Sequence, residues 1–463
     1  MKTKQYEVQE RVKLPEKMGF AVFSTSTNII FNFKSAYYLL FLTNVLNIPV
    51  LTASTILTLG TIWDAINDPL IGYWSVNHKF KTGEKVRPLA LYFAIPWAIT
   101  IVLMFSNFNL SRMLTVALCL IIYFFFEAFY TFLCMPYNSM GALATNNDED
   151  RKSINVFRSL GGTLGSGIGA VAILPIVKLF GGLQGEGAII GPSDAPALFK
   201  TALLMAALCI VGCMSHYFTS KERVHQESDN EDKISFVDTF KMLFSIKPWV
   251  LNMLYILCYG IDTAIVLNSI NYYAAYILGA SSKATPILAG YLVVAIITAI
   301  LVGKIDKKIG RRKTMMLACI VQIVTKIPFI INPYSMISIY LNAAGVGFGG
   351  TVAFVMFGTN RNNITDIVEF KFARRIDTMV ATCDNLISKT AEALTVQLMG
   401  VALAAAGFNT ALELAQPQAA LDTICYLLGW VPCIVTIAML LFAMKNDIAG
   451  EYQKAKEAYE SQK

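Results

Sequence analysis

The chain has 463 residues, of which 55% are hydrophobic and only 15% are charged, and its formal net charge is +7. The apolar residues fall in blocks of roughly 20, the length at which a helix crosses a bilayer, so the sequence predicts a polytopic membrane protein. The positive charge does not indicate nucleic-acid binding, because the basic residues are spread over short loops between the apolar blocks. Nine cysteines lie within those blocks without a CxxC or metal-ligand pattern, which favours packing residues over a disulfide framework.

Twelve membrane spans are predicted, and they indicate an all-α membrane protein of two six-helix bundles. The polar segment 220–247 follows six spans and precedes six more, which is typical of transporters built from repeats. We therefore expect an N-terminal bundle over 1–219, a central cytoplasmic loop over 220–247, a C-terminal bundle over 248–444 and a cytoplasmic tail over 445–463. The spans are 18–45, 50–77, 88–107, 112–142, 155–180, 197–219, 248–278, 285–304, 314–332, 336–359, 376–408 and 421–444.

The basic residues orient these spans. The two tails and the loops predicted on their side hold 30 of the 38 Lys and Arg residues, whereas the opposite loops hold four. Loops rich in Lys and Arg stay in the cytoplasm, so we expect a multi-pass protein of the cell membrane with both termini cytoplasmic.

Two carboxylates lie inside the second predicted span. Asp64 and Asp68 are four residues apart, so a helix stacks them on one face about 6 Å apart along its axis, with Asn67 beside them. Acids persist at membrane depth mainly where they face a cavity, a partner or an ion pathway. This cluster of oxygen ligands predicts a cation site. The alternative is that one acid caps or gates a helix broken at Pro69.

The stretch 63–72, Trp-Asp-Ala-Ile-Asn-Asp-Pro-Leu-Ile-Gly, resembles the second-helix signature of the glycoside-pentoside-hexuronide:cation symporters, the melibiose permease family of the major facilitator superfamily. Tyr130-Thr131 with Pro136 resembles the family's fourth helix, and 148–158 resembles its acidic-basic loop and fifth-helix arginine. The loops 72–85 and 303–313 echo each other and resemble the gating loop of the superfamily. The resemblance spans most of the chain and implies a two-bundle secondary transporter.

The resemblance also implies an ion site. By position, Asp64, Asn67, Asp68 and Thr131 correspond to the residues with which the family holds its coupling sodium, proton or lithium ion. Sodium prefers hard oxygen ligands, and two carboxylates, an amide and a hydroxyl supply them. If the ion is sodium, Asp64 and Asp68 would be its charged ligands. No cofactor is expected beyond the coupling ion, sodium or a proton.

The sugar contacts of melibiose permease are mostly replaced. Asn28 and Cys134 stand where it carries two acids, and Asn138 stands where it carries a stacking tryptophan, while Arg158 remains. The resemblance therefore argues against a galactoside like melibiose. The loss of acids around a retained arginine favours an anionic substrate such as a hexuronide, because a desolvated carboxylate pairs well with arginine.

Other charged residues inside the spans each have two interpretations. Lys34 and Lys389 could contact substrate and make its cavity more positive, although Lys34 could instead snorkel to the interface. Glu127 shares a face with the predicted ion site and could be a ligand or proton carrier, or it could pair with one of these lysines. Asp262 and Asp384 could contact substrate or take part in coupling, or they could form bonds between helices.

Two glycine runs, 161–169 and 345–350, have no strand before them and no Gly-Lys-Ser/Thr after them, so they do not indicate a phosphate loop. Small residues in membrane helices allow close packing, and we expect these runs to lie against neighbouring helices.

Together these features predict a secondary active transporter that carries a glycoside, pentoside or hexuronide with a cation by alternating access, with substrate bound between the bundles. Two alternatives stay open: a cation-coupled transporter of an amphiphile such as a lysolipid, and a non-transporting membrane sensor. No nucleophile-base pair or metal cluster indicates an enzyme. The expected partners are a small-molecule sugar, a monovalent cation and the lipid bilayer, and we expect a monomer.

Overall fold

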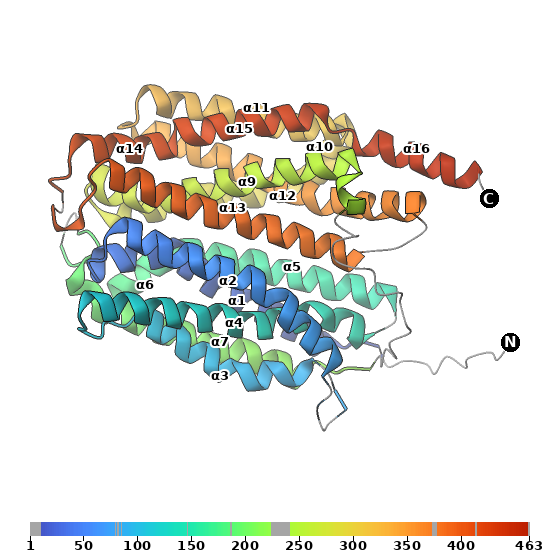
Figure 1. Ribbon diagram of the computed structural model, residues 1–463, viewed down its shortest axis with the longest axis horizontal. Helices are drawn as coiled ribbons and strands as arrows, with labels where there is room; N and C mark the ends of the chain where they lie inside the picture. The colour runs from blue at the N-terminus through green and yellow to red at the C-terminus, as the bar shows by residue number, and fades with distance from the viewer. Residues whose placement is uncertain are drawn as a thin grey trace. The chain divides into compact units, whose positions relative to one another are not determined.

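The computed structural model describes residues 11–461 apart from 79, 81–82, 85, 146, 186–187, 224–240, 373–376 and 413. All regular secondary structure in these residues is helical (Figure 1). Helices suit a membrane because they satisfy every backbone hydrogen bond within one segment. The predicted all-α class is confirmed.

Most helices follow the predicted spans, but the helix over the span 336–359 continues to Phe372, the spans 155–180 and 421–444 are each broken into two helices, and the predicted tail contains a further helix. In the N-terminal half they are α1 (Leu14–Leu40) with the π-helical turn η1 (Phe41–Val45), α2 (Val50–Asn77), α3 (Arg87–Met104), α4 (Arg112–Ala144), α5 (Asp148–Val171), α6 (Ile173–Leu179), η2 (Pro192–Asp194) and α7 (Ala195–Thr219). In the C-terminal half they are α9 (Lys247–Tyr272) with η3 (Tyr273–Ile277), η4 (Ser281–Lys283), α10 (Ala284–Ile309), α11 (Arg311–Ile331), α12 (Met336–Phe372), α13 (Asp377–Ala405), η5 (Thr410–Leu412), α14 (Gln418–Leu428), α15 (Trp430–Lys445) and α16 (Ile448–Ser461).

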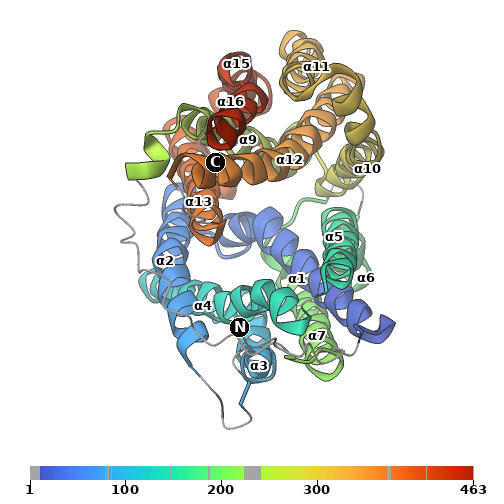
Figure 2. The ribbon, with the colours of Figure 1, turned by 90° about the vertical axis from the view of Figure 1, so that its right-hand side faces the viewer.

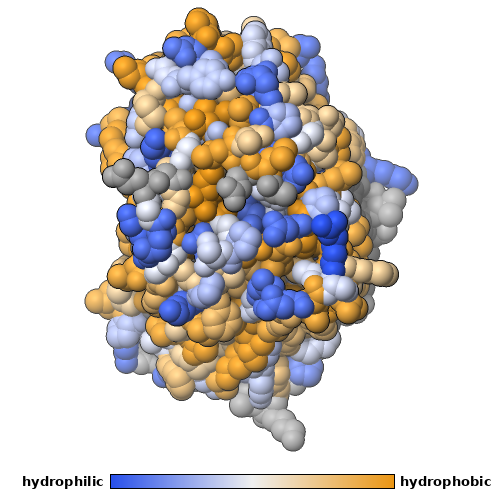
Figure 3. Space-filling model, turned by 90° about the vertical axis from the view of Figure 1, so that its left-hand side faces the viewer, coloured by the Kyte–Doolittle hydropathy of each residue, from blue (hydrophilic) through white to orange (hydrophobic). Residues whose placement is uncertain are grey.

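Most of these helices could cross a bilayer. Among the described residues, nine are long and apolar enough, and a tenth is obtained if the bent pair 153–169 and 173–179 forms one span. The first two predicted spans coincide with α1 and α2, which are helical but carry charged residues such as Lys34 and Asp64 and are not among the nine. Large hydrophobic side chains are exposed along the helices, whereas the end viewed in Figure 3 mixes hydrophilic with hydrophobic groups. This is the pattern of a membrane protein with many spans.

The chain forms two compact units. The first contains the described parts of 1–48, 63–184 and 190–231, and the second those of 49–62, 185–189 and 232–463. Helix α2 contributes to both, because its first half packs on α13 within the second unit. There the Thr58 hydroxyl donates to Gln397 Oε1 at 3.1 Å, and a Cβ on Gly400 would lie 1.9 Å from Ser54 Oγ. The predicted central loop lies mostly outside the described residues.

The two halves repeat one backbone turn. After η1 and after η3 the chain makes the same pair of backbone hydrogen bonds and then passes through a left-handed residue, Asn47 (φ 53°) in the first half and Gly279 (φ 71°) in the second. The bonds run from Leu46 and Ile48 to Phe41 and Leu42, and from Leu278 and Ala280 to Tyr273 and Ala274. Each residue of the second turn lies at the same separation in sequence from the matching residue of the first. The two halves therefore share an internal repeat, of which the loop sequences 72–85 and 303–313 show only a weak similarity.

The glycine runs are packing surfaces, as predicted. Viewed along the helices, α1 lies between α5 and α7 (Figure 2). A Cβ on Gly161 would lie 2.2 Å from the carbonyl oxygen of Ala21, and one on Gly165 would lie 2.3 Å from that of Thr25. Glycine every fourth residue therefore lets α5 approach α1 to backbone contact. In the second run, a Cβ on Gly347 would lie 2.5 Å from the carbonyl oxygen of Tyr291 on α10.

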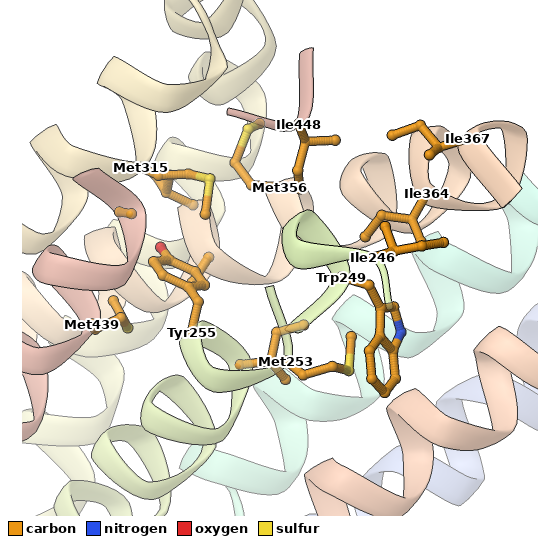
Figure 4. Close-up of a cluster of buried hydrophobic side chains, with 14 of the residues drawn as sticks. Ile246, Trp249, Met253, Tyr255, Met315, Met356, Ile364, Ile367, Met439 and Ile448 are labelled. Carbon is orange, nitrogen blue, oxygen red and sulfur yellow. The ribbon is translucent and has the colours of Figure 1, made fainter. Parts of the chain in front are cut away.

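A continuous apolar core holds the second unit together. Trp249 and Tyr255 of α9 pack with Met315 of α11 and Met356 of α12 (Figure 4). The same cluster continues through Ile364, Ile367, Met439 and Ile448, so that it joins the end of α12 to α15 and α16. Helix α12 is therefore fixed along its length.

We predict that Gly165→Ala destabilises the protein. The added methyl group would overlap the α1 backbone, and overpacking of this kind typically costs about 1–3 kcal/mol. The matched control is Gly303→Ala in α10, where a Cβ meets nothing within 4 Å. Thermal unfolding of the purified variants should show a lower midpoint for Gly165→Ala only. Equal midpoints for the two variants would contradict the close packing.

Candidate functional site: a carboxylate pair and a hydroxyl on α2 and α4

The predicted ion ligands meet between α2 and α4 in the first unit. The Thr131 hydroxyl oxygen lies 3.1 Å from Asp64 Oδ1 and 2.9 Å from Asp68 Oδ1. Thr131 is 2% exposed and Asp64 7% exposed, and Asp68 is half-buried. The helical spacing of four residues stacks the two carboxylates, as the sequence predicts, and α4 adds the hydroxyl from the other side.

The Thr131 hydroxyl has fewer protons than the acceptors around it require. The Thr131 hydroxyl has one proton but three oxygen neighbours, since the carbonyl oxygen of Glu127 is also 3.1 Å away. A hydroxyl can donate that proton to only one acceptor at a time. The remaining oxygens lie close to a hydroxyl oxygen without a proton between them, which is favourable when a cation or an additional proton lies among them. The arrangement can thus bind a small cation.

Asn67 is buried on the same helix. Its side chain is 6% exposed, and among the described residues its amide nitrogen has no hydrogen-bond partner. That nitrogen is a donor, so it would bind an acceptor and only the amide oxygen could contact a cation. No group of three or more His, Cys, Asp or Glu side chains in the described part of the chain is placed to hold a metal ion. A sodium ion at this site would therefore draw on the Thr131 hydroxyl oxygen as well as on the two carboxylates.

Trp63 fixes the register of α2 against α4. Its indole nitrogen donates to the carbonyl oxygen of Phe124 at 3.1 Å, and its ring stacks on that of Phe124. Since Asp64 follows Trp63 directly, this contact holds the carboxylate opposite the α4 face that carries Thr131. Trp63 belongs to the stretch 63–72, but its role in positioning Asp64 could not be predicted from the sequence.

Lys34 and Glu127 form a buried ion pair, which is the second of the two interpretations. Lys34 Nζ lies 3.2 Å from Glu127 Oε1 and 3.3 Å from the hydroxyl oxygen of Tyr123. The side chains are 6% and 4% exposed, and the ammonium also lies over the ring of Phe31. The pair balances the charge of Lys34, so Lys34 no longer supports the argument for a more positive substrate cavity. Whether Glu127 takes part in coupling stays a prediction.

Asp262 is also paired, within the second unit. Its Oδ1 lies 2.6 Å from Lys326 Nζ on α11, with both side chains at most 1% exposed. Thr436 of α15 donates to the same oxygen at 3.1 Å, and Gln322 lies within reach of the lysine. The network joins three helices, which matches the alternative that Asp262 forms bonds between helices.

The predicted substrate residues of the first unit form two groups. Arg158 Nη2 donates to Asn138 Oδ1 at 2.5 Å, and its guanidinium lies 4.5 Å above the ring of Tyr137. Asn28 faces α5 instead, since it accepts from the Ser166 hydroxyl at 3.2 Å. Thus Arg158 and Asn138 come together, whereas Asn28 is occupied in the packing of α1 on α5.

The other predicted substrate residues are less closely defined. Cys134 is half-buried on α4, and its thiol is free. Lys389 is half-buried on α13. Asp384 lies on the same helix, but its side chain is outside the described residues. These three assignments stay predictions.

Sequence reasoning missed Lys326, Gln322 and Thr436. A signal was present, because Lys326 is a charge inside the apolar span 314–332 and such a residue needs a partner within the membrane. Asp262 lies in another span of the same half and carries the opposite charge. Matching opposite charges within each half would have paired them.

The helices and the polar cluster between them define an α-helical membrane transporter. Residues 19–449 match the family described as MFS/sugar transport protein. The chain therefore belongs to this family of transporters, which are not enzymes, and its resemblance to the glycoside-pentoside-hexuronide:cation symporters is confirmed.

The relatives agree with this assignment. The isoprimeverose transporter of Lactiplantibacillus pentosus is 26% identical over 90% of this chain and 85% of its own length. The uncharacterized symporter YjmB of Bacillus subtilis (strain 168) is 26% identical over 87% of this chain and 85% of its own length. The solved structure of the nucleoside transporter NupG has a TM-score of 0.65 at 11% identity and covers 93% of this chain and 99% of its own, which shows the shared fold.

We predict that Asp262→Asn destabilises the second unit strongly. It leaves the Lys326 ammonium buried without a counter-charge, and breaking a buried pair in this way costs about 3–5 kcal/mol. The double variant Asp262→Leu with Lys326→Met removes both charges and should retain far more stability. Thermal unfolding of the two purified variants compares them directly, and a double variant less stable than Asp262→Asn would refute this explanation.

Proposed function

We propose that this protein couples the entry of a sugar to a cation, sodium or a proton, which binds at Asp64, Asp68 and Thr131 with help from Asn67. The observation that carries the proposal is the convergence of two carboxylate oxygens on one buried hydroxyl. The similarity to the isoprimeverose transporter supports a sugar as the substrate, and the similarity to a symporter supports coupling.

The cation would act by changing the charge of the site. Two carboxylates side by side repel each other in a medium of low dielectric constant, and a bound cation removes that repulsion. Ion binding then favours the arrangement in which α2 and α4 lie close together. Any effect of the ion on sugar affinity must be matched by an equal effect of the sugar on ion affinity.

Arg158 supports an acidic sugar as the substrate. In the part of the chain that the structure describes, it has no carboxylate partner and makes two hydrogen bonds, both to Asn138. A guanidinium has five donors in a planar fork that matches a carboxylate. Stacking on Tyr137 and bonding to Asn138 orient the fork before substrate arrives, so less entropy is lost on binding.

The ion site is tested by Asp68→Asn. We expect this change to remove the stimulation of uptake by the coupling ion, because an amide cannot neutralise a cation. The matched control is Asp422→Asn on α14, where the new amide can still accept the hydrogen bond from Gln418. Uptake would be measured in proteoliposomes with a panel of glycosides, pentosides and hexuronides, with sodium or a pH gradient applied separately. Ion-stimulated uptake that survives in Asp68→Asn would overturn the proposal.

The acidic substrate is tested at Arg158. We expect Arg158→Gln to raise the KM of a hexuronide by about 30-fold, since a charge pair that loses one partner costs about 2 kcal/mol. Arg158→Lys keeps the charge but loses the fork, so its effect should be smaller. The control is the KM of a neutral sugar of the same ring size. If neutral sugars alone are carried, the acidic class is wrong, and uptake of a lysolipid would favour an amphiphile instead.

A further inference from the structure

Helix α4 is joined to its neighbours through long side chains. Among the described residues, α4 packs closely along α3, and α1 meets α4 through ring contacts such as Phe31 with Tyr130 as well as through Lys34. Lys34 reaches Tyr123 and Glu127, which are two turns and one turn before Thr131 on α4. Lys34 therefore makes its polar contacts with the part of α4 that leads directly into Thr131.

The helix that carries Lys34 is itself firmly placed. The close approach of α5 through Gly161 and Gly165 fixes α1 on one side, and Gly212 of α7 fixes it on the other, where a Cβ would lie 1.8 Å from Ser26 Oγ. Lys34 thus projects from a rigid support. An ammonium held by such a support can position the carboxylate that it meets on α4.

Glu127 and Thr131 are one helical turn apart and share a face. The Thr131 hydroxyl oxygen is 3.1 Å from the Glu127 carbonyl oxygen, so a movement of the Glu127 backbone moves the hydroxyl as well. The opposite side of that hydroxyl meets Asp64 and Asp68. A chain of contacts therefore runs from Lys34 on α1 through Glu127 to the carboxylates on α2.

We propose that Lys34 and Glu127 are positioning residues of the coupling-ion site: their ion pair holds α4 so that Thr131 faces Asp64 and Asp68. This inference rests on the function proposed above. Neither side chain needs to touch the ion. The pair also keeps the Glu127 carboxylate engaged with Lys34, so that the charge around the ion is set by the two aspartates.

The test measures binding of the ion alone to purified full-length protein. Sodium chloride replaces choline chloride at constant ionic strength and pH, and pH is varied separately in choline chloride. The thermal midpoint reports binding, because a ligand that binds only the folded state stabilises it. The double variant Lys34→Met with Glu127→Leu removes both charges, so no buried charge is left without its counter-charge. We expect its half-saturating ion concentration to rise about tenfold, the size of coupling typical of residues in one network.

Two comparisons separate positioning from general damage. The exchange Lys34→Glu with Glu127→Lys restores an ion pair and should return half-saturation to within about threefold of the original. The double variant Asp262→Leu with Lys326→Met deletes the buried pair of the second unit and should leave ion half-saturation unchanged. If the Lys34 and Glu127 double variant does not fold, Glu127→Gln keeps the shape and should still weaken ion binding, because the Lys34 ammonium is no longer neutralised.

The outcomes distinguish this inference from the proposed function. An ion response that persists in Asp68→Asn would show that the ion binds elsewhere, and both would fail. If Asp68→Asn abolishes the response but the folded Lys34 and Glu127 variants bind the ion as tightly as the original protein, the ion site stands and the positioning role is overturned. An equal weakening by the Asp262 and Lys326 variant would also overturn it.

Discussion

The cost of burying charge in apolar helices governs this protein. Water is absent from the middle of a membrane, so an ionised side chain there needs a partner or a site to which an ion comes. Lys34 meets Glu127, and Asp262 meets Lys326, each pair between two helices. At Asp64 and Asp68 the structure brings two like charges to a single hydroxyl instead. The two pairs join helices, whereas the two aspartates are the residues proposed to bind the cation.

The internal repeat makes this asymmetry clearer. Both halves end their first helix in the same π-helical turn and the same left-handed residue, so the backbone plan is shared. The chemistry is not shared: apart from Thr298, residues 295–301 in the corresponding part of α10 are apolar, whereas α2 carries two aspartates. The fold is thus built from two similar halves, and the proposed ion ligands belong to the first. In the second half, the buried charges of Asp262 and Lys326 belong to a hydrogen-bond network that joins α9, α11 and α15.

Much of this could be predicted from the sequence because membrane helices follow simple rules. Apolar length located the spans, although α12 runs on to Phe372 and the last span is two helices, α14 and α15. The spacing of Asp64 and Asp68 placed them on one face. Glycine at every fourth position indicated the packing of α5, although not that α1 was its partner. The pairing of Lys34 with Glu127 could be stated only as one of two options, since sequence does not show how helices are rotated about their axes. Lys326 was missed because a single charge in an apolar span has no local pattern, and its partner is 64 positions away along the chain.

Helix α2 is continuous, but its two halves make their contacts in different units. Its first half is fastened in the second unit, where Thr58 meets Gln397 and Gly400 allows Ser54 to approach. Its second half carries the aspartates of the first unit. A helix transmits displacement along its length because each turn is bonded to the next. If a cation binds as proposed, the reduced repulsion between Asp64 and Asp68 would act on the helix that also carries Thr58, less than two turns away from Asp64. The proposed ion ligands and the contacts of α2 in the second unit therefore lie on one continuous helix, through which the proposed coupling could pass.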